Sequence, residues 1–193
     1  IAEMVRGEMV ERFGENAYTG GYTVHTTVTG PEQAAANQGV RNALDAYSER
    51  HGYHGPEERL DPLPDGQSAL DGVLSDRPTV GELLPAIVIA VEEKSVRIYL
   101  GGGKEDVIEW GQMKWARKYI NTNRRGPAPK LASDVLAAGD IIRVKRVETK
   151  DKDKEPRELW RLAQIPRAAA ALVALDPRDG AIRSLVGGYD FYY

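Results

Sequence analysis

Residues 86–110 read AIVIAVEEKSVRIYLGGGKEDVIEW, a dense run of β-forming residues. Three segments rich in Val, Ile, Leu and Tyr, at 86–92, 96–100 and 105–110, are separated by polar or glycine-containing turns. The three glycines at 101–103 tolerate the tight backbone conformations that a hairpin turn requires. The stretch therefore predicts three consecutive antiparallel strands.

Five strands and one intervening helix are predicted between residues 78 and 166. Five short strands with a helix between the third and the fourth match the count of an OB-type barrel. The expected fold class is mainly β with some α, centred on a small OB-like five-stranded barrel at 78–166. After the first three strands, the expected elements are a short helix at 111–119, a polar basic loop at 121–130, a helical turn at 133–136, and strands at 141–149 and 158–164 around a charged hairpin tip at 150–156.

The segments on either side of the barrel predict a second, composite linker module. The alternating sequence YTVHTTV predicts a half-buried strand at 21–29, and an apolar stripe predicts a helix at 31–51. A two-stranded hairpin is expected at 169–187, around the turn sequence DPRDG. We expect the strand to pair with the hairpin and the helix to pack on the resulting sheet, because an isolated hairpin needs a third partner.

These elements divide the chain into five expected regions. Because the sequence opens at Ile1 within a helical pattern, we also expect the chain to be a piece of a longer protein. The regions are an N-terminal helix from a preceding linker at 1–19, a linker strand and helix at 20–56, a connector at 57–77, the OB-like domain at 78–166, and the first hairpin of a following domain at 167–193.

Composition excludes several classes of protein. The chain has 193 residues, 41% of them hydrophobic and 28% charged, which is typical of a globular protein. It has no Cys, which excludes disulfides, zinc ribbons and thiol nucleophiles. The longest apolar run is far shorter than the roughly 20 residues that span a bilayer. The net charge of −3 divides unevenly: residues 1–76 hold 13 acidic and 5 basic side chains, and residues 77–193 hold 16 and 21.

One cluster of basic residues lies between Gln112 and Ser133, a stretch that contains no acidic residue. Such a cluster can attract an anionic polymer or an acidic protein surface, although charge runs are most often simply solvated. Nearby aromatic side chains could stack bases or sugars, but they could equally complete a barrel core. The candidate interaction surface consists of Lys114, Arg117, Lys118, Arg124, Arg125 and Lys130; the aromatic residues are Trp110, Trp115 and Tyr119.

Catalytic and cofactor motifs are absent from the sequence. No Ser is followed three residues later by Lys, and no Ser-His-Asp set can be recognised. His51 and His54 have the spacing of metal ligands on a helix, but neither a thiol nor a convincing acidic partner accompanies them. We therefore expect no catalytic residue, no metal and no cofactor, and no enzyme activity in this chain.

Two stretches carry a resemblance to a known family. The sequence GYTVHTTV at 21–28, followed by QAA at 33–35, resembles the linker strand and helix of the bifunctional class A penicillin-binding proteins of the 1A type. The sequence ALVALDPRDGAIRSLVGGY at 171–189 resembles the opening hairpin of its transpeptidase domain. The intervening region, with WAR at 115–117 and GDIIRV at 139–144, looks like the OB-like insert. Thr29 stands where the family usually has Asp, although Thr also serves as a helix cap.

The resemblance implies a non-catalytic regulatory or interaction region of a periplasmic peptidoglycan synthase that is anchored in the inner membrane. The family's glycosyltransferase domain and the transpeptidase motifs Ser-x-x-Lys, Ser-x-Asn and Lys-Thr-Gly have no match here, so no catalytic residue is carried over. The implied partners are other domains of the synthase and an outer-membrane lipoprotein activator or glycan strands, with no nucleic acid. The alternative is a stand-alone OB-fold module that binds an oligonucleotide or an oligosaccharide.

Overall fold

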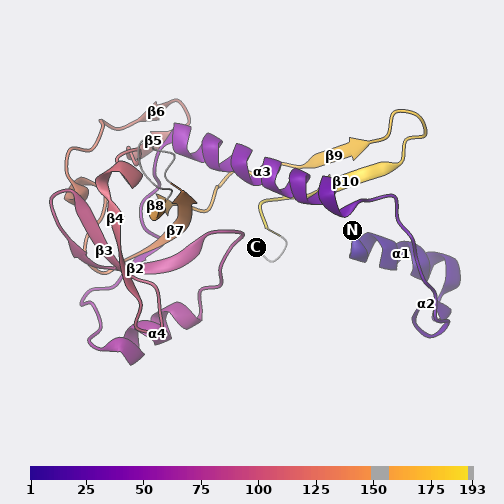
Figure 1. Cartoon of the computed structure of the whole chain (residues 1–193), viewed down its shortest axis with the longest axis horizontal. Helices are drawn as coiled ribbons and strands as arrows, with labels where there is room; N and C mark the ends of the chain where they lie inside the picture. The colour runs from indigo at the N-terminus through magenta and orange to yellow at the C-terminus, as the bar shows by residue number, and fades with distance from the viewer. Residues whose placement is uncertain (149–156, 191–193) are drawn as a thin grey trace. The chain divides into compact units, whose positions relative to one another are not determined.

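The computed structural model describes residues 1–148 and 157–190 (Figure 1). The chain divides into two compact units: Ile1–Val40 with Ala170–Gly188, and Arg41–Ala169 with Tyr189–Tyr193. The expected hairpin tip at 150–156 lies outside the described residues. Within the described ranges, no helix combines the length and apolar character that crossing a bilayer requires.

The second unit is built on antiparallel strands, and all five strands predicted for the OB-like domain occur. In the described residues these five strands and the short strand β1 form a six-stranded sheet in the order β1-β7-β2-β3-β4, with β8 also pairing with β7. The strands are β1 (Glu58–Arg59), β2 (Leu84–Val91), β3 (Ser95–Tyr99), β4 (Glu105–Glu109), β7 (Asp140–Glu148) and β8 (Glu158–Ala163).

Strand β2 is buried on both faces, which explains its unbroken apolar sequence. Ala86 and Val88 contribute to the main core, whereas Ile87 points to the opposite side, into a second cluster that contains Leu74. Leu74 lies on helix α4 (Gln67–Ser75), which belongs to the segment expected to be a connector. The connector therefore supplies a helix that covers the outer face of the sheet, as well as the short strand β1 (Figure 1).

The two end strands of the sheet, β4 and β8, are linked by side chains. The Trp160 indole Nε1–H donates to the Asp106 carboxylate at 2.8 Å, and Arg157 pairs with Glu109 at 2.6 Å. Trp160 is 6% exposed and belongs to the main core. In the described residues no backbone pairing joins β4 to β8. Closure of the five-stranded barrel therefore stays a prediction.

The prediction of a helix at 111–119 is wrong. Only a 3-10 turn, η1 (Trp110–Gln112), forms; hydrogen-bonded turns follow at 113–115, and the chain then joins a β-bridge at Lys118. The reason is a competing backbone partner: Tyr53 N–H donates to Arg117 O at 2.7 Å, and Tyr119 N–H donates to Tyr53 O at 2.8 Å. These bonds place Lys118 in a parallel β-bridge with Tyr53. A helix through residues 117–119 would use the same backbone groups and break the bridge. The expected loop at 121–130 also contains part of a small hairpin, made of β5 (Tyr119–Asn121) and β6 (Arg124–Arg125).

The first unit contains three helices or helix segments and one hairpin in its described residues. Helix α3 (Gly30–His51) confirms the predicted helix, and the boundary between the units falls within it, after Val40. The predicted hairpin is also confirmed, as β9 (Leu172–Leu175) and β10 (Ile182–Val186). The other helices are α1 (Ala2–Phe13) and α2 (Asn16–Thr19).

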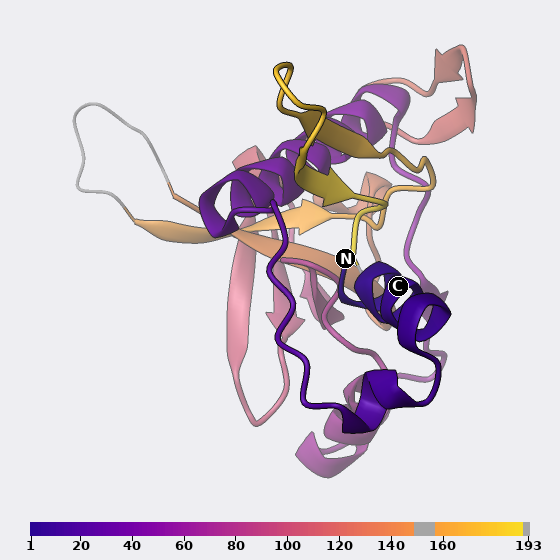
Figure 2. The ribbon, with the colours of Figure 1, turned by 90° about the vertical axis from the view of Figure 1, so that its right-hand side faces the viewer.

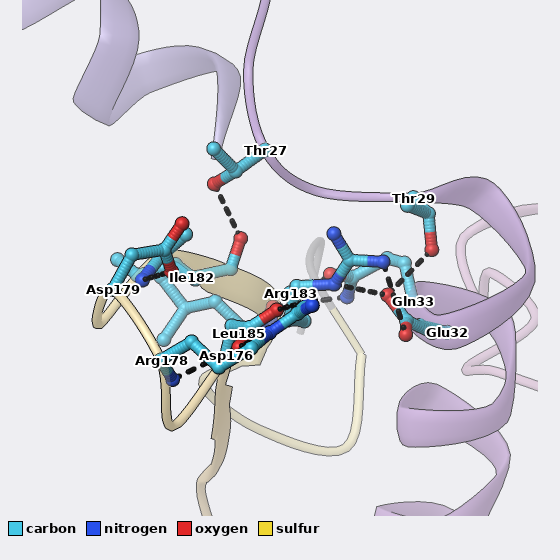
Figure 3. A network of polar contacts seen from close by, with 11 residues as sticks. Thr27, Thr29, Glu32, Gln33, Asp176, Arg178, Asp179, Ile182, Arg183 and Leu185 are labelled. Carbon is cyan, nitrogen blue, oxygen red and sulfur yellow. Dashed lines mark hydrogen bonds and ion pairs between the residues drawn. The ribbon is translucent and has the colours of Figure 1, made fainter.

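The prediction of a strand at 21–29 is also wrong, because this segment does not pair with another strand. Two hydrogen bonds join it to β10: Thr27 Oγ1 donates to Ile182 O at 2.6 Å (Figure 3), and Thr29 N–H donates to Arg183 O at 3.3 Å. The next outward-facing backbone groups of β10 are occupied by a helix side chain. Gln33 Nε2 donates to Leu185 O at 2.9 Å, and Leu185 N–H donates to Gln33 Oε1 at 3.0 Å. A side-chain amide thus takes the place of the third strand.

Replacing Gln33 by Met should loosen this edge, because both bonds to Leu185 are lost while the length of the side chain is kept. The hydrogen bond from the Leu185 N–H contributes about 1 kcal/mol, so this amide proton should exchange about five times faster with solvent. Hydrogen exchange followed by NMR measures this rate. Ala35→Met, at an exposed position of the same helix, is the control and should leave the exchange rate unchanged. Equal rates in the two variants would contradict the assigned role of Gln33.

Candidate functional site

The six basic residues predicted as an interaction surface do not form one continuous cluster by contact. Arg124 and Arg125 form β6 of the β5–β6 hairpin, a two-stranded sheet separate from the six-stranded one (Figure 2), and Lys118 directly precedes β5. All three side chains are exposed. Arg117 is only partly exposed, because its Nε donates to the Gly126 carbonyl at 2.7 Å. The hairpin therefore carries the most accessible part of the predicted surface.

The other two predicted residues, Lys114 and Lys130, are also exposed but have different surroundings. The backbone N–H of Lys130 donates to Asp134 at 2.7 Å, and that of Leu131 donates to the same carboxylate at 3.0 Å. These backbone bonds, more than the nearby lysine charges, lower the pKa of Asp134. An acidic side chain just beyond the basic stretch therefore offsets part of its positive charge.

The two tryptophans close to the basic residues belong to the hydrophobic core rather than to an open stacking platform. Trp110 and Trp115 pack against the main core cluster, and Trp115 Nε1–H donates to Leu162 O at 3.1 Å. Trp115 also meets the Tyr53 ring edge to face, with centroids 5.9 Å apart. Both tryptophans are thus partly buried against the core, and the Trp110 ring also carries the Lys94 ammonium 4.7 Å from its centroid.

A hollow that the sequence did not predict lies beside the loop that follows α3. Three adjoining cavities, of about 420, 430 and 260 Å³, all include His54 and Arg167 in their lining. We call this region the His54 hollow and define it by the side chains that offer polar or aromatic groups to it. These are Tyr47, His51, His54, Glu57, Lys118, Tyr119, Asp134 and Arg167.

The His54 hollow has a fixed backbone because Gln164 ties three groups of the loop and helix together. Gln164 Oε1 accepts the His54 N–H at 2.9 Å, while Nε2 donates to Gly52 O at 2.9 Å and to Ser48 Oγ at 2.8 Å. Gly52 has φ 111°, and a Cβ there would lie 2.7 Å from Arg117 O. Only glycine therefore fits at this bend.

Each histidine of the hollow packs against a tyrosine ring: His51 stacks on Tyr47, and the His54 ring is tilted by 39° from that of Tyr119. The His51 and Tyr47 ring centroids are 4.0 Å apart, and those of His54 and Tyr119 are 4.2 Å apart. His51 Nδ1 also lies 2.8 Å from Tyr47 O. The histidine spacing of three thus reflects two aromatic contacts, and a search of the described residues finds no group of three side chains placed to hold a metal ion.

The charges around the hollow leave one guanidinium unpaired. Glu57, on the wall of the cavity of about 420 Å³, is bound to Arg143, whose Nε lies 2.7 Å from the carboxylate. In the described part of the chain, no carboxylate pairs with the exposed Arg167. Burial and the positive charge of Arg167 lower the pKa of His54, so its imidazole is mainly neutral at pH 7. The hollow therefore offers a neutral imidazole beside an available cation.

Comparison with known proteins identifies the class. A family model described as the penicillin-binding protein OB-like domain matches residues 53–168, which include the six-stranded sheet and, of the His54 hollow, the residues from His54 onward. The chain therefore belongs to the penicillin-binding proteins that carry an OB-like domain.

Within this class the chain is similar to penicillin-binding proteins 1A. The protein from Pseudomonas aeruginosa is 48% identical over 193 residues, and the one from Vibrio cholerae is 44% identical over 197. These matches cover 99% and 100% of this chain but 22% and 23% of the relatives. The crystal structure of penicillin-binding protein 1A from Haemophilus influenzae aligns with a TM-score of 0.73 at 35% identity, over 98% of this chain and 26% of that one. The chain spans about a quarter or less of the length of these relatives.

Replacing Arg167 by Ala should raise the pKa of His54, because one of the two causes that lower it is removed while burial remains. NMR titration of the His54 ring protons measures this pKa, and Arg167→Lys, which keeps the charge, should stay close to the parent chain. The folded-state pKa lies below the unfolded value of about 6.5. The contribution of His54 to stability is therefore complete above that pH and decreases as the pH falls below it. An unchanged titration in Arg167→Ala would contradict the placement of this guanidinium.

Proposed function

We propose that this chain is a non-catalytic interaction region of a peptidoglycan synthase that polymerises glycan strands and crosslinks their stem peptides. The proposal is supported by the similarity of almost the whole chain to penicillin-binding proteins 1A. The observation that carries the interaction role is the exposed β5–β6 hairpin with its basic residues Lys118, Arg124 and Arg125. Exposed cations on a small, separate hairpin are well suited to an acidic partner surface.

The proposed partner is a protein that regulates the synthase, of the outer-membrane lipoprotein type that the family resemblance implies. The proposed location is accordingly the periplasm, with the synthase anchored in the inner membrane. Other domains of the synthase are the second proposed partner. We also propose that β4 and β8 close the OB-like barrel, a closure supported by the Trp160–Asp106 bond between them.

The alternative, a stand-alone OB-fold module, receives limited support. OB folds bind oligonucleotides and oligosaccharides with a strand face and adjoining loops. The core positions of Trp110 and Trp115 remove two candidate stacking platforms, and the net charge of −3 disfavours a polyphosphate. The His54 hollow is the feature that could still serve such a module.

The basic hairpin can be tested by competition. We expect the purified 193-residue chain, added to penicillin-binding protein 1A of P. aeruginosa and its lipoprotein activator, to reduce stimulated crosslinking by occupying the activator. Arg124→Glu together with Arg125→Glu should weaken this inhibition roughly tenfold, since reversing two contact charges replaces attraction by repulsion. The inhibition constant for crosslinking is the measurement.

The matched control reverses two exposed charges elsewhere in the same unit, Arg97→Glu together with Lys104→Glu. This variant should inhibit like the parent chain. If both double variants inhibit equally, or if the parent chain does not inhibit at all, the basic hairpin is not the interaction surface.

The absence of catalysis is tested with a fluorescent penicillin. We expect no covalent adduct on the 193-residue chain after gel separation, because its sequence contains no Ser-x-x-Lys nucleophile motif. Full-length penicillin-binding protein 1A from P. aeruginosa serves as the positive control. A labelled band at the size of this chain would show an acylated residue and would overturn the assignment.

A further inference from the structure

The His54 hollow has the chemistry of a binding site for an acidic sugar. Its cavities of about 420 and 430 Å³ fall in the range of small-molecule pockets. Three kinds of group line them. The first is the aromatic ring of Tyr119; the second is the set of hydrogen-bonding groups, which are the His54 imidazole and the carboxylates of Glu57 and Asp134; the third is the pair of cations, Arg167 and Lys118. Each kind matches a different part of a carboxylated saccharide.

The cation of Arg167 is available to a ligand because no carboxylate of the described residues holds it. A guanidinium binds a carboxylate through two parallel hydrogen bonds, which gives both strength and direction. The acidic side chains of the hollow are already engaged: Glu57 pairs with Arg143, and Asp134 accepts two backbone N–H groups. An incoming carboxylate therefore meets an unpaired cation beside acids whose charges are partly neutralised.

The remaining groups suit hydroxyls and a sugar ring. The neutral His54 imidazole offers one donor and one acceptor, and the engaged carboxylates of Glu57 and Asp134 keep lone pairs that can accept from hydroxyls. The rings of Tyr119 and Tyr47 give apolar surface on which the C–H face of a sugar can lie. Tyr47 is 40% exposed, so its ring is accessible from solvent.

We propose that the His54 hollow binds a saccharide that carries a carboxylate, with the carboxylate on Arg167 and the sugar ring against Tyr119. Gln164 and Gly52 keep the loop in the shape that holds His54 in the hollow. A single-stranded nucleic acid fits less well, because it needs a series of cations along its phosphates. Of the three cations that line the hollow, Arg143 is already paired with Glu57, which leaves Arg167 and Lys118.

Two matched sugars test the proposal with the full 193-residue chain. N-acetylmuramic acid and N-acetylglucosamine differ by one carboxylate-bearing ether group, and NMR titration reports both affinity and the residues affected. We expect the acid to shift the resonances of His54 and Tyr119 and to bind roughly tenfold more tightly than the neutral sugar. The choice of these two sugars rests on the proposed role in peptidoglycan synthesis. The site itself is inferred from the residues that line the hollow.

Variants of Arg167 separate binding from folding. Arg167→Ala should weaken binding of N-acetylmuramic acid roughly tenfold. Arg167→Lys should weaken it by a smaller factor, because Lys keeps the charge but lacks the planar guanidinium that makes two parallel hydrogen bonds. Arg97→Ala, at an exposed arginine on β3, is the control and should bind like the parent chain. Thermal unfolding of each variant checks that the fold is intact.

The outcomes are decisive. Equal affinity for the two sugars, no shift at His54, or unchanged binding by a folded Arg167→Ala variant overturns the proposal. Shifts in the hollow caused by a 15-residue oligothymidylate without shifts from N-acetylmuramic acid would overturn it in favour of a nucleic acid. None of these results changes the crosslinking competition, which depends on Arg124 and Arg125, so the two proposals fail separately.

Discussion

Strand β7 is the constraint on which the second unit depends. One of its edges pairs with β2, and the other pairs first with β1 and then with β8. Its side chains from Asp140 to Val144 are all buried. Because both edges are occupied and the faces are covered, β7 can be displaced only by breaking three strand pairings together.

The start of β7 explains why the polar residues buried there are tolerated. Asp140 is fully buried, but its carboxylate accepts from the Ala137 N–H at 2.8 Å and from the Arg59 guanidinium. Just before it, Gly139 has φ 87°, and a Cβ at that position would lie 2.2 Å from Leu60 O. Any other residue would push β1 away from β7 and leave Asp140 without Arg59, so burial of the carboxylate and the identity of Gly139 depend on each other.

The sequence predicts the strands well where local pattern and tertiary packing agree. The apolar run that becomes β2 and the glycine turn after β3 leave little alternative, and the family resemblance is confirmed by the match of the OB-like domain. The prediction fails at 111–119, because the bonds from Tyr53 to Arg117 and Tyr119 join segments more than 60 residues apart. Pattern analysis cannot see such a partner. The His54 hollow was missed for the same reason, since Arg167 and Tyr119 meet His54 only in the folded chain.

Two glutamines show a physical principle that residue patterns do not carry. Gln33 bonds to the N–H and the C=O of Leu185, and Gln164 accepts the His54 N–H while donating to Gly52 O. A side-chain amide has the same donor and acceptor as a peptide group, so it can satisfy a backbone edge that no strand reaches. At Leu185 this replaces the strand expected at 21–29; at His54 it fixes a loop without regular structure. The Gln33 amide occupies the free edge of β10, and the Gln164 amide fixes the loop that carries His54. The same chemical group therefore supports both the scaffold and the proposed site.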